Sequence, residues 1–254
     1  MKLMTYNILD GAINTLLQVI EIVNQTSPDF LTLNEANTFA ENDHKLLEEF
    51  ADKTNFSHFE IALSGEGNYH VAVFSKFPFI ETKKLQPLSR ACLITTINSP
   101  FGLLSVASLH LSPFSEDTQH GEIDLIVNAQ KEYPNRILMG DLNSLSRIDK
   151  YDEKIIDKFN EAQRKKFTKD GELRYDAIDK ILSVGYFDPA IKMDKNMEPT
   201  VPTAANKDNT HGNMRLDYIF LSESLMPHLL NYSVIRTKLT DQASDHYPVT
   251  IELA

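Results

Sequence analysis

The segment SDHYPV, residues 244–249, places a carboxylate and an imidazole side by side just before the last apolar run of the chain. Gly, Asn or Ser usually form the turn ahead of a strand, so Asp245 and His246 are unexpected there. A polar turn is one explanation. The other is a reaction centre in which an acid binds a metal ion and an imidazole moves a proton. That centre would need further polar groups upstream.

Polar side chains do stand at several points where an apolar run meets a loop, which is where a rigid sheet can present chemistry. They are Asn7, Glu35, His110, Asp141, Asn143 and Asp217. Asp141 and Asn143 are two residues apart in an apparently extended segment, so we expect their side chains to point the same way. Asp217 would share a strand face with apolar residues, which is costly for an unpaired carboxylate. We expect His246 to be its partner.

Taken one at a time, these residues have ordinary structural explanations. Asp141 in GDLN suits a turn, and His110 suits a partly buried, hydrogen-bonded histidine. Glu35 suits a helix cap, and Asn7 suits the end of a strand. It is the ordered set that favours catalysis.

Apolar periodicity predicts the elements that would position these groups. Strands are expected at 2–8, 30–35, 56–63, 69–75, 91–97, 103–111, 136–142, 215–221, 232–238 and 249–254, and helices near 13–23, 45–50 and 123–127. Residues 91–97 and 103–111 should form a hairpin. Residues 150–185 look mainly helical, and 188–214 reads as a loop. Many strands with few helices predict stacked sheets with helices outside, in one domain over 1–254.

The composition, with 42% hydrophobic and 24% charged residues, is that of a globular protein. The single cysteine, Cys92, excludes an internal disulfide and suits a reducing compartment; its strand-like surroundings predict a buried small side chain. No apolar run reaches the ~18 residues of a membrane span. The start of the chain meets Asn7 and Asp10 too soon for a secretory signal. We expect a monomeric cytoplasmic protein.

The charge balance argues against broad electrostatic binding of nucleic acid. Acidic residues outnumber basic ones by 36 to 25, a net charge of −11. The basic clusters at 83–84 and 164–166 are short and are interpreted as solvated faces. We therefore expect weak binding to long duplex DNA.

Six motifs in order, TYNIL, LTLNEA, SLHL, GDLNS, RLDYIF and SDHYPV, resemble the endonuclease/exonuclease/phosphatase superfamily. This group includes deoxyribonucleases, exonuclease III-like enzymes, sphingomyelinases and inositol-polyphosphate 5-phosphatases. The resemblance covers essentially the whole chain, with one departure: Asn34 precedes Glu35 where members commonly have Gln. It implies an α/β fold, a four-layer α/β/β/α sandwich of two mixed β-sheets packed face to face with helices outside. It also implies a divalent-metal phosphodiesterase or phosphatase.

The resemblance assigns Glu35 as the principal metal ligand, with Asp245 as a further ligand and Asn7 close to the metal or the phosphate. Such oxygen-rich ligands select a hard cation, Mg²⁺ or Mn²⁺. We therefore expect Mg²⁺ or Mn²⁺ as the cofactor.

The resemblance also assigns catalytic roles. Asp141 matches the residue that orients or deprotonates the attacking water, and Asn143 matches a donor to a phosphate oxygen. His246 would contact the phosphoryl group as acid, base or donor, with Asp217 holding its tautomer. His110 matches a second histidine of the deoxyribonuclease and sphingomyelinase branches.

The substrate stays open: a nucleic acid, a phospholipid head group or a small phosphoester. The segments 64–70 and 188–214 are expected to flank the site. His70, Arg90, His211 and Arg215 would be able to contact phosphate, with structural roles as the alternative, and Arg215 is taken as a substrate-binding candidate.

Two other functions are alternatives. One is a catalytically inactive member of the same fold that acts as a phosphate- or partner-binding module. The other is a Ser/His/Asp hydrolase, which requires an elbow such as G-x-S-x-G that the sequence lacks.

Overall fold

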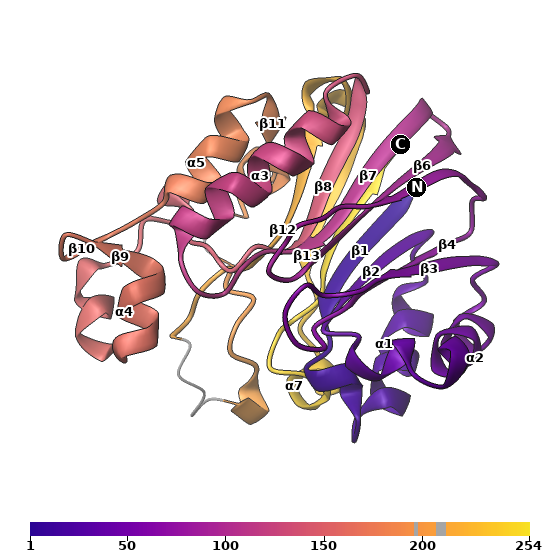
Figure 1. Ribbon diagram of the computed structural model, residues 1–254, viewed down its shortest axis with the longest axis horizontal. Coiled ribbons are helices and arrows are strands. Elements are labelled where there is room, and N and C mark those ends of the chain that lie inside the picture. Colours follow the sequence, from indigo (N-terminus) through magenta and orange to yellow (C-terminus); the bar gives the residue numbers. More distant parts are fainter. Residues whose placement is uncertain (196–197, 207–211) are drawn as a thin grey trace.

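Two six-stranded sheets face each other, with helices on their outer sides (Figure 1). The computed structural model describes residues 1–195, 198–206 and 212–254. The predicted four-layer α/β/β/α sandwich is confirmed. Among the described helices, none has the length and apolar character needed to cross a membrane.

The first sheet has the strand order β13-β14-β1-β2-β4-β3, and only β1 and β2 run parallel. Its strands are β1 (Lys2–Asn7), β2 (Phe30–Asn34), β3 (His58–Ala62), β4 (Val71–Ser75), β13 (Leu229–Val234) and β14 (Val249–Leu253). Helices α1 (Leu16–Thr26) and α2 (Lys45–Thr54) cover its outer face and pack against alternate strand residues such as Met4, Leu31 and Phe74.

The second sheet has the order β11-β12-β8-β7-β6-β5, and again one pair, β7 and β8, is parallel. Its strands are β5 (Phe79–Lys84), β6 (Ala91–Ser99), β7 (Gly102–His110), β8 (Asn135–Asp141), β11 (Tyr186–Phe187) and β12 (Asp217–Ser222). Helices α3 (Glu116–Gln130) and α5 (Asp176–Ser183) cover its outer face. The β6–β7 hairpin is as predicted.

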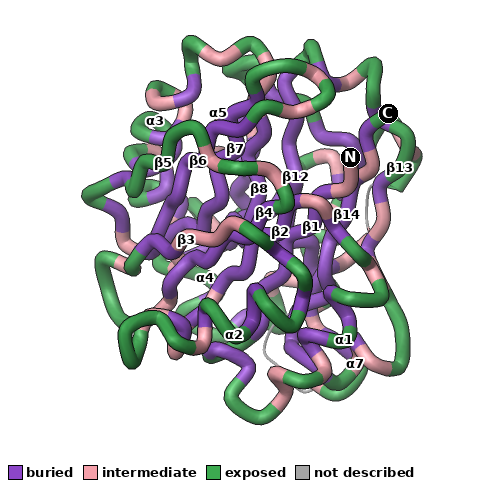
Figure 2. The backbone as a smooth tube through the Cα atoms, turned by 90° about the vertical axis from the view of Figure 1, so that its right-hand side faces the viewer, coloured by how far each residue is buried: buried purple, intermediate pink, exposed green. Residues whose placement is uncertain are grey.

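Both faces of the central strands are buried, because one face meets the other sheet and the opposite face meets helices. In β8, Ile137 and Met139 belong to the core between the sheets, whereas Leu138 belongs to the core under α3 and α5. Figure 2 shows the result: most strands run through the buried interior, and exposed residues lie mainly on helices, on connections and on the edge strand β5. The central strands are therefore held on both sides, which gives the residues at their ends fixed positions.

The remaining elements are short. They are α4 (Glu161–Phe167), α6 (Pro189–Lys192), α7 (Thr240–Ala243), the two-residue strands β9 (Thr168–Lys169) and β10 (Glu172–Leu173), and single 3-10 turns at 10–12, 37–40, 42–44, 147–149, 153–158, 204–206 and 223–228.

The structure differs from the prediction at several places, including the short strands β9, β10 and β11 and the helix α6 inside the predicted loop 188–214. Strand β5 was missed because it is an edge strand whose last five residues are exposed, so it carries no apolar alternation. Residues 150–185 are less helical than predicted. The first helix begins at Leu16, after positive φ angles at Gly11 and Ala12. Strand β13 ends at Val234, four residues before the predicted end of that strand.

Glycine is required at Gly140, one residue before the end of β8. Its φ is +149°, and a Cβ at this position would lie 1.7 Å from the carbonyl oxygen of Leu109 on β7. A larger residue at Gly140 would therefore disturb the pairing of β7 and β8 directly beside His110 and Asp141, which are neighbours in the register.

Candidate active site

Polar residues from both sheets meet around a cavity of about 320 Å³. Six of the nine predicted site residues line it: Glu35, His110, Asp141, Asn143, Asp245 and His246. Two more, Asn7 and Asp217, contact these residues directly from behind the lining. The ninth, Arg215, does not line this cavity.

The sheet topology explains why these residues converge. The carboxyl ends of the parallel strands in a sheet lie at one edge, and an antiparallel neighbour begins at that same edge. In the second sheet, Asp141 at the end of β8 pairs with His110 at the end of β7 and with Asp217 at the start of β12. In the first sheet, Asn7 pairs with Asn34, and Glu35 follows directly.

Glu35 is held in place by its first-sheet neighbours. Its Oε1 accepts a hydrogen bond from Asn7 Nδ2 at 3.2 Å, and its Oε2 accepts one from the backbone amide of Asp10 at 3.1 Å. Its φ of 58° turns the chain away from β2. Burial raises the pKa of the Glu35 carboxyl above its usual value, although Asp10, His246 and Asn7 act in the opposite direction.

Hydrogen bonds from the first sheet reach across to the second. Asn34 Nδ2 donates to the Leu109 carbonyl at 2.7 Å, and the Asp141 amide donates to Asn34 Oδ1 at 3.1 Å. Asn7 Nδ2 donates to Asp141 Oδ2 at 3.1 Å. Asn34, the residue that departs from the common family motif, thus joins the strands that carry Glu35, His110 and Asp141.

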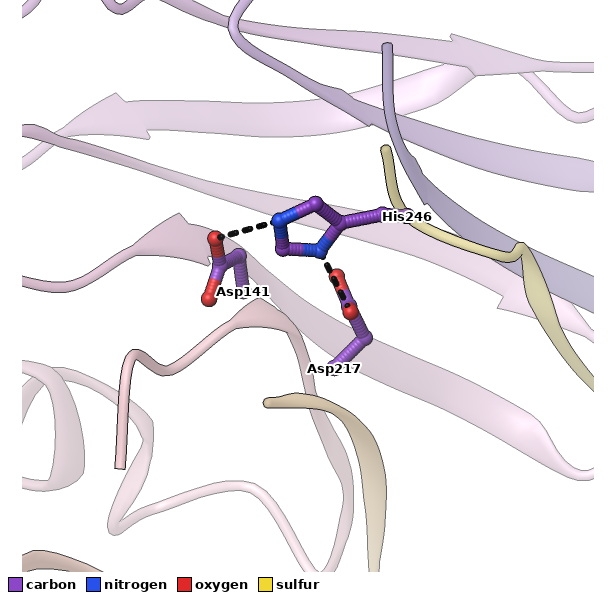
Figure 3. A group of neighbouring side chains, drawn as sticks. All are labelled: Asp141, Asp217 and His246. Carbon is purple, nitrogen blue, oxygen red and sulfur yellow. Dashed lines mark hydrogen bonds and ion pairs between the residues drawn. The ribbon is translucent and has the colours of Figure 1, made fainter. Parts of the chain in front are cut away.

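His246 lies between two carboxylates (Figure 3). Its Nδ1 is 2.8 Å from Asp217 Oδ2, as the sequence suggested, and its Nε2 is 4.0 Å from Asp141 Oδ2. Burial alone would lower the pKa of His246, but the charge of Asp217 and its hydrogen bond, followed by Asp245 and Asp141, raise it to about 10. The ring is therefore an imidazolium at neutral pH, with Nδ1–H donated to Asp217.

His110, unlike His246, is uncharged at neutral pH. Burial lowers its pKa to about 4, with Arg90, His246 and Lys166 acting in the same direction and Asp141 opposing them. Its Nε2 lies 3.5 Å from Asp141 Oδ2, and its Nδ1 has no hydrogen-bond partner in the part of the chain that the structure describes. The site thus contains one neutral and one charged histidine beside the same carboxylate.

Asp141 is buried and surrounded by donors. Burial alone would raise the pKa of Asp141. The pKa is nevertheless held below its usual value by the nearby charges of His110, His246 and Lys166 and by the hydrogen bond from the backbone amide of Asn143. The Asn143 amide donates to Asp141 Oδ1 at 2.9 Å. The prediction that Asp141 and Asn143 belong to one extended segment was wrong: β8 ends at Asp141, and Asn143 has a φ of 52°. Both side chains nevertheless line the cavity.

Lys166 is a lining residue that the sequence interpretation placed on a solvated face. Its neighbours Arg164 and Lys165 are exposed, but Lys166 is buried on the inner side of α4, and its Nζ donates to Asn143 Oδ1. The signal in the sequence was Phe167, since this apolar residue shows that one side of the short helix faces inward.

The other phosphate-binding candidates have different surroundings. Arg90 and Tyr69 line the cavity. His70 is buried, and its Nδ1 accepts the Ser64 amide at 3.0 Å, which fits a structural role. His211 lies outside the described residues.

The expected contact between Arg215 and the substrate is not supported. Arg215 is 1% exposed, and its Nη2 forms ion pairs with Asp149 at 2.9 Å and Asp188 at 2.7 Å. Its charge is neutralised inside the protein, away from the cavity, so its environment is structural.

The lining residues fit a hard divalent cation. Three carboxylates, those of Glu35, Asp141 and Asp245, face one cavity, and such a set of oxygen ligands suits a hard cation. Ligand atoms of Asp141, Asp217 and His246 also lie within 4.8 Å of one another. In that group, however, Asp217 is already bonded to His246, which fits proton handling better than metal binding.

A sequence model of the Endonuclease/Exonuclease/phosphatase family matches residues 4–246. No curated protein matches the chain. Solved structures do: an AP endonuclease from Archaeoglobus fulgidus (18% identity, TM-score 0.76), an endonuclease/exonuclease/phosphatase family protein from Leptotrichia buccalis C-1013-b (21%, 0.70) and a 3′ phosphatase, NExo, from Neisseria bound to a product DNA hairpin (18%, 0.69). Each alignment covers 100% of this chain and 99% of the other. At these identities, the similarity shows a shared fold.

The His246–Asp217 pair generates a prediction about protonation. Replacing Asp217 by Asn removes the carboxylate at 2.8 Å and leaves burial to act, so the pKa of His246 should fall by roughly two pH units, the scale of a lost opposite charge. Titration of the imidazole ¹⁵N shifts by NMR would measure this. An unchanged titration in Asp217→Asn would contradict the assigned pair.

The raised pKa of His246 also determines how the stability of the fold changes with pH. The folded-state pKa of His246, about 10, lies above the ordinary 6.5. Its protonation therefore stabilises the fold fully below pH 6.5, and the contribution is lost as the pH rises through about 10.

Proposed function

The chain belongs to the endonuclease/exonuclease/phosphatase family, and we propose that it is a metal-dependent hydrolase that cleaves a phosphodiester or phosphomonoester by in-line attack of water. The observation that carries the proposal is the position of His246, with Nδ1 2.8 Å from Asp217 and Nε2 4.0 Å from Asp141, in a cavity that Glu35 and Asp245 also line. Ester hydrolysis at phosphorus requires a positioned water, neutralisation of phosphoryl charge and help for the leaving oxygen.

Asp141 is the proposed base that orients the attacking water and accepts its proton. Its low pKa keeps it ionised at neutral pH, and the donors from Asn7 and Asn143 fix the direction of its two oxygens. Asp141 also ends the strand β8, which lies between the strands that carry His110 and Asp217.

His246 is the proposed donor to the phosphoryl group. With Nδ1–H donated to Asp217, its Nε2–H is the proton that faces the cavity, and its positive charge complements charge that develops on phosphoryl oxygens. A ring with a pKa near 10 is already protonated at neutral pH, so it has no free nitrogen that can accept a proton. His246 is therefore assigned the role of donor and Asp141 that of base.

Asn143 and His110 are proposed to position the phosphoryl group beside them. The side-chain amide of Asn143 is fixed because its Nδ2 donates to the Leu111 carbonyl at 3.2 Å, while its Oδ1 accepts from Lys166. The NH₂ group has a second hydrogen, which does not contact the Leu111 carbonyl and is able to donate to a substrate oxygen. Neutral His110 is able to donate or accept at low energetic cost.

The carboxylates of Glu35 and Asp245, with Asn7 close by, are the proposed ligands of Mg²⁺ or Mn²⁺. When bound, such an ion supplies electrostatic stabilisation of the charge on the phosphoryl oxygens. The hydrogen bonds from Asn7 and from the Asp10 amide orient Glu35 for this purpose.

The proposed substrate carries a phosphate ester, and three sources are open: a nucleic acid, a phospholipid head group or a small phosphoester. Two of the structural neighbours are described as an AP endonuclease and a 3′ phosphatase with product DNA, which supports including DNA in a substrate panel.

Catalysis should depend on His246 and Asp141 while the fold does not. His246→Ala and Asp141→Asn should each lower kcat by ~10²-fold or more, the scale of a removed transition-state donor or base. The measurement is steady-state hydrolysis over a panel of bis-p-nitrophenyl phosphate, DNA, RNA, sphingomyelin and inositol phosphates. His228→Ala, at an exposed histidine, is the control. Near wild-type kcat in a folded His246→Ala protein would exclude the assignment.

Activity should also depend on a hard divalent cation. It should disappear in excess chelator and return with Mg²⁺ or Mn²⁺, whereas Ca²⁺, with its looser coordination, should support it poorly. Glu35→Gln should raise the metal concentration needed for half-activity, and Glu48→Gln, on the exposed side of α2, should not. Full hydrolysis in excess chelator would refute the metal requirement.

Long duplex DNA should bind weakly, with a Kd of ~10⁻⁵ M or weaker at physiological salt, because acids outnumber bases by 36 to 25. Fluorescence anisotropy of a labelled duplex across a salt series, with Asp141→Asn to prevent cutting, would measure it. Sub-micromolar binding with a steep salt slope would contradict this expectation and assign the chain to duplex processing.

A further inference from the structure

Two cationic side chains to which the proposed reaction assigns no contact with the substrate line the same cavity. Arg90 is 9% exposed and Lys166 is 6% exposed. Arg90 Nη1 donates to the Glu66 carbonyl at 2.9 Å, and Lys166 Nζ donates to Asn143 Oδ1. Within the described ranges, no carboxylate forms an ion pair with either side chain, and Arg90 Nε has no hydrogen-bond partner.

Other buried arginines of the chain are paired. Arg215 contacts Asp149 and Asp188, and Arg174 contacts Asp117 at 2.7 Å and Asp176 at 2.6 Å. A buried charge is costly unless an opposite charge and hydrogen bonds accompany it. Arg90 and Lys166 therefore lack the direct ion pair that Arg174 and Arg215 have, although nearby carboxylates act on both. The cavity is where an anion from outside would supply a direct contact.

The two cations are close enough to repel each other. Burial lowers the pKa of Lys166 to about 8, and Arg90 acts in the same direction, while Asp141, Glu116 and Glu35 oppose them. At neutral pH the ammonium group is still protonated. A bound anion between the two groups would relieve both the repulsion and the burial cost.

Both side chains are held in place before any ligand binds. The Arg90 guanidinium lies over the Tyr69 ring at 3.9 Å, with the Phe114 ring at 5.6 Å. Lys166 stands on α4, whose first turn is fixed by reciprocal hydrogen bonds between Asn160 and Gln163. Preorganised cations bind an anion at a lower entropic cost than mobile surface lysines do.

We propose that Arg90 and Lys166 form a phosphate subsite that binds the second negative charge of a terminal phosphate, so that the enzyme prefers phosphomonoesters to phosphodiesters. This specificity rests on the hydrolase function proposed above. A diester carries one charge, which His246 and a divalent cation already meet, whereas a monoester dianion carries one more. The cavity, at about 320 Å³, is at the small end for ligand pockets and suits a chain end.

The test compares kcat/KM for p-nitrophenyl phosphate and bis-p-nitrophenyl phosphate with Mg²⁺. The wild-type protein should prefer the monoester. Arg90→Gln should lower kcat/KM for the monoester by roughly 10- to 100-fold, the scale of a lost charge-assisted contact, and for the diester by less than about threefold. Lys166→Gln also removes the donor that orients Asn143, so it should lower kcat/KM for both esters, and for the monoester by roughly tenfold more than for the diester. Lys166→Arg, which keeps the charge, should retain most of the preference. Lys165→Gln, an exposed neighbour of equal charge, should change neither rate.

A binding measurement separates the subsite from turnover. Calorimetric titration should show tighter binding of inorganic phosphate than of dimethyl phosphate to the wild-type protein, and the difference should be lost in both charge-removing variants. Thermal unfolding identifies a variant that fails to fold, in which case the other variant decides.

The outcomes distinguish the two proposals. A preference for the diester, or an equal loss for both esters in Lys166→Gln and Arg90→Gln, would overturn the subsite and leave the hydrolase function standing. If neither ester is hydrolysed, the hydrolase function fails for these esters and the phosphate titration alone decides the subsite. Equal phosphate binding by the wild-type protein and both variants would then overturn it.

Discussion

The site depends on the alignment of the two sheets at the edge where Asp141 lies. The apolar core between the sheets provides most of the favourable free energy, but it is tolerant of small sliding because apolar contacts have no direction. The hydrogen bonds of Asn34 and Asn7 do have direction. Asn34 donates to the Leu109 carbonyl and accepts from the Asp141 backbone amide, and Asn7 donates to the Asp141 carboxylate. These buried bonds fix the distance between Glu35 on one sheet and Asp141 on the other.

The same arrangement divides the charges of the site. Both histidines lie beside Asp141, yet burial leaves His110 neutral while His246 is charged. The difference comes from their second neighbours, because His246 has the Asp217 carboxylate at 2.8 Å whereas His110 has the cations Arg90 and Lys166 nearby. Two chemically identical side chains thus acquire different capacities, one for donating to an anion and one for adjusting to it.

Sequence and structure agree best where the strand pattern locates a residue. Asn7, Glu35, His110 and Asp141 all stand where an apolar run ends, and such runs can be located from the sequence. The failures arose where the partner is distant in sequence. Arg215 looked available beside Asp217, but its counter-ions Asp149 and Asp188 are supplied by other segments. Lys166 looked exposed within RKK, although the small core cluster that includes Phe159 and Phe167 turns that side of α4 inward.

Lys166 also decides how Asn143 can act. An amide side chain has two orientations of similar shape, and a substrate oxygen can bind only the one that presents the NH₂ group. The Leu111 carbonyl can accept only from the NH₂ group, and the ammonium of Lys166 can donate only to the oxygen. Together they set the amide with one hydrogen of Nδ2 free of these contacts. The helix α4, the element whose role in the site was hardest to foresee, therefore helps to orient a residue that the sequence motif GDLN made easy to find.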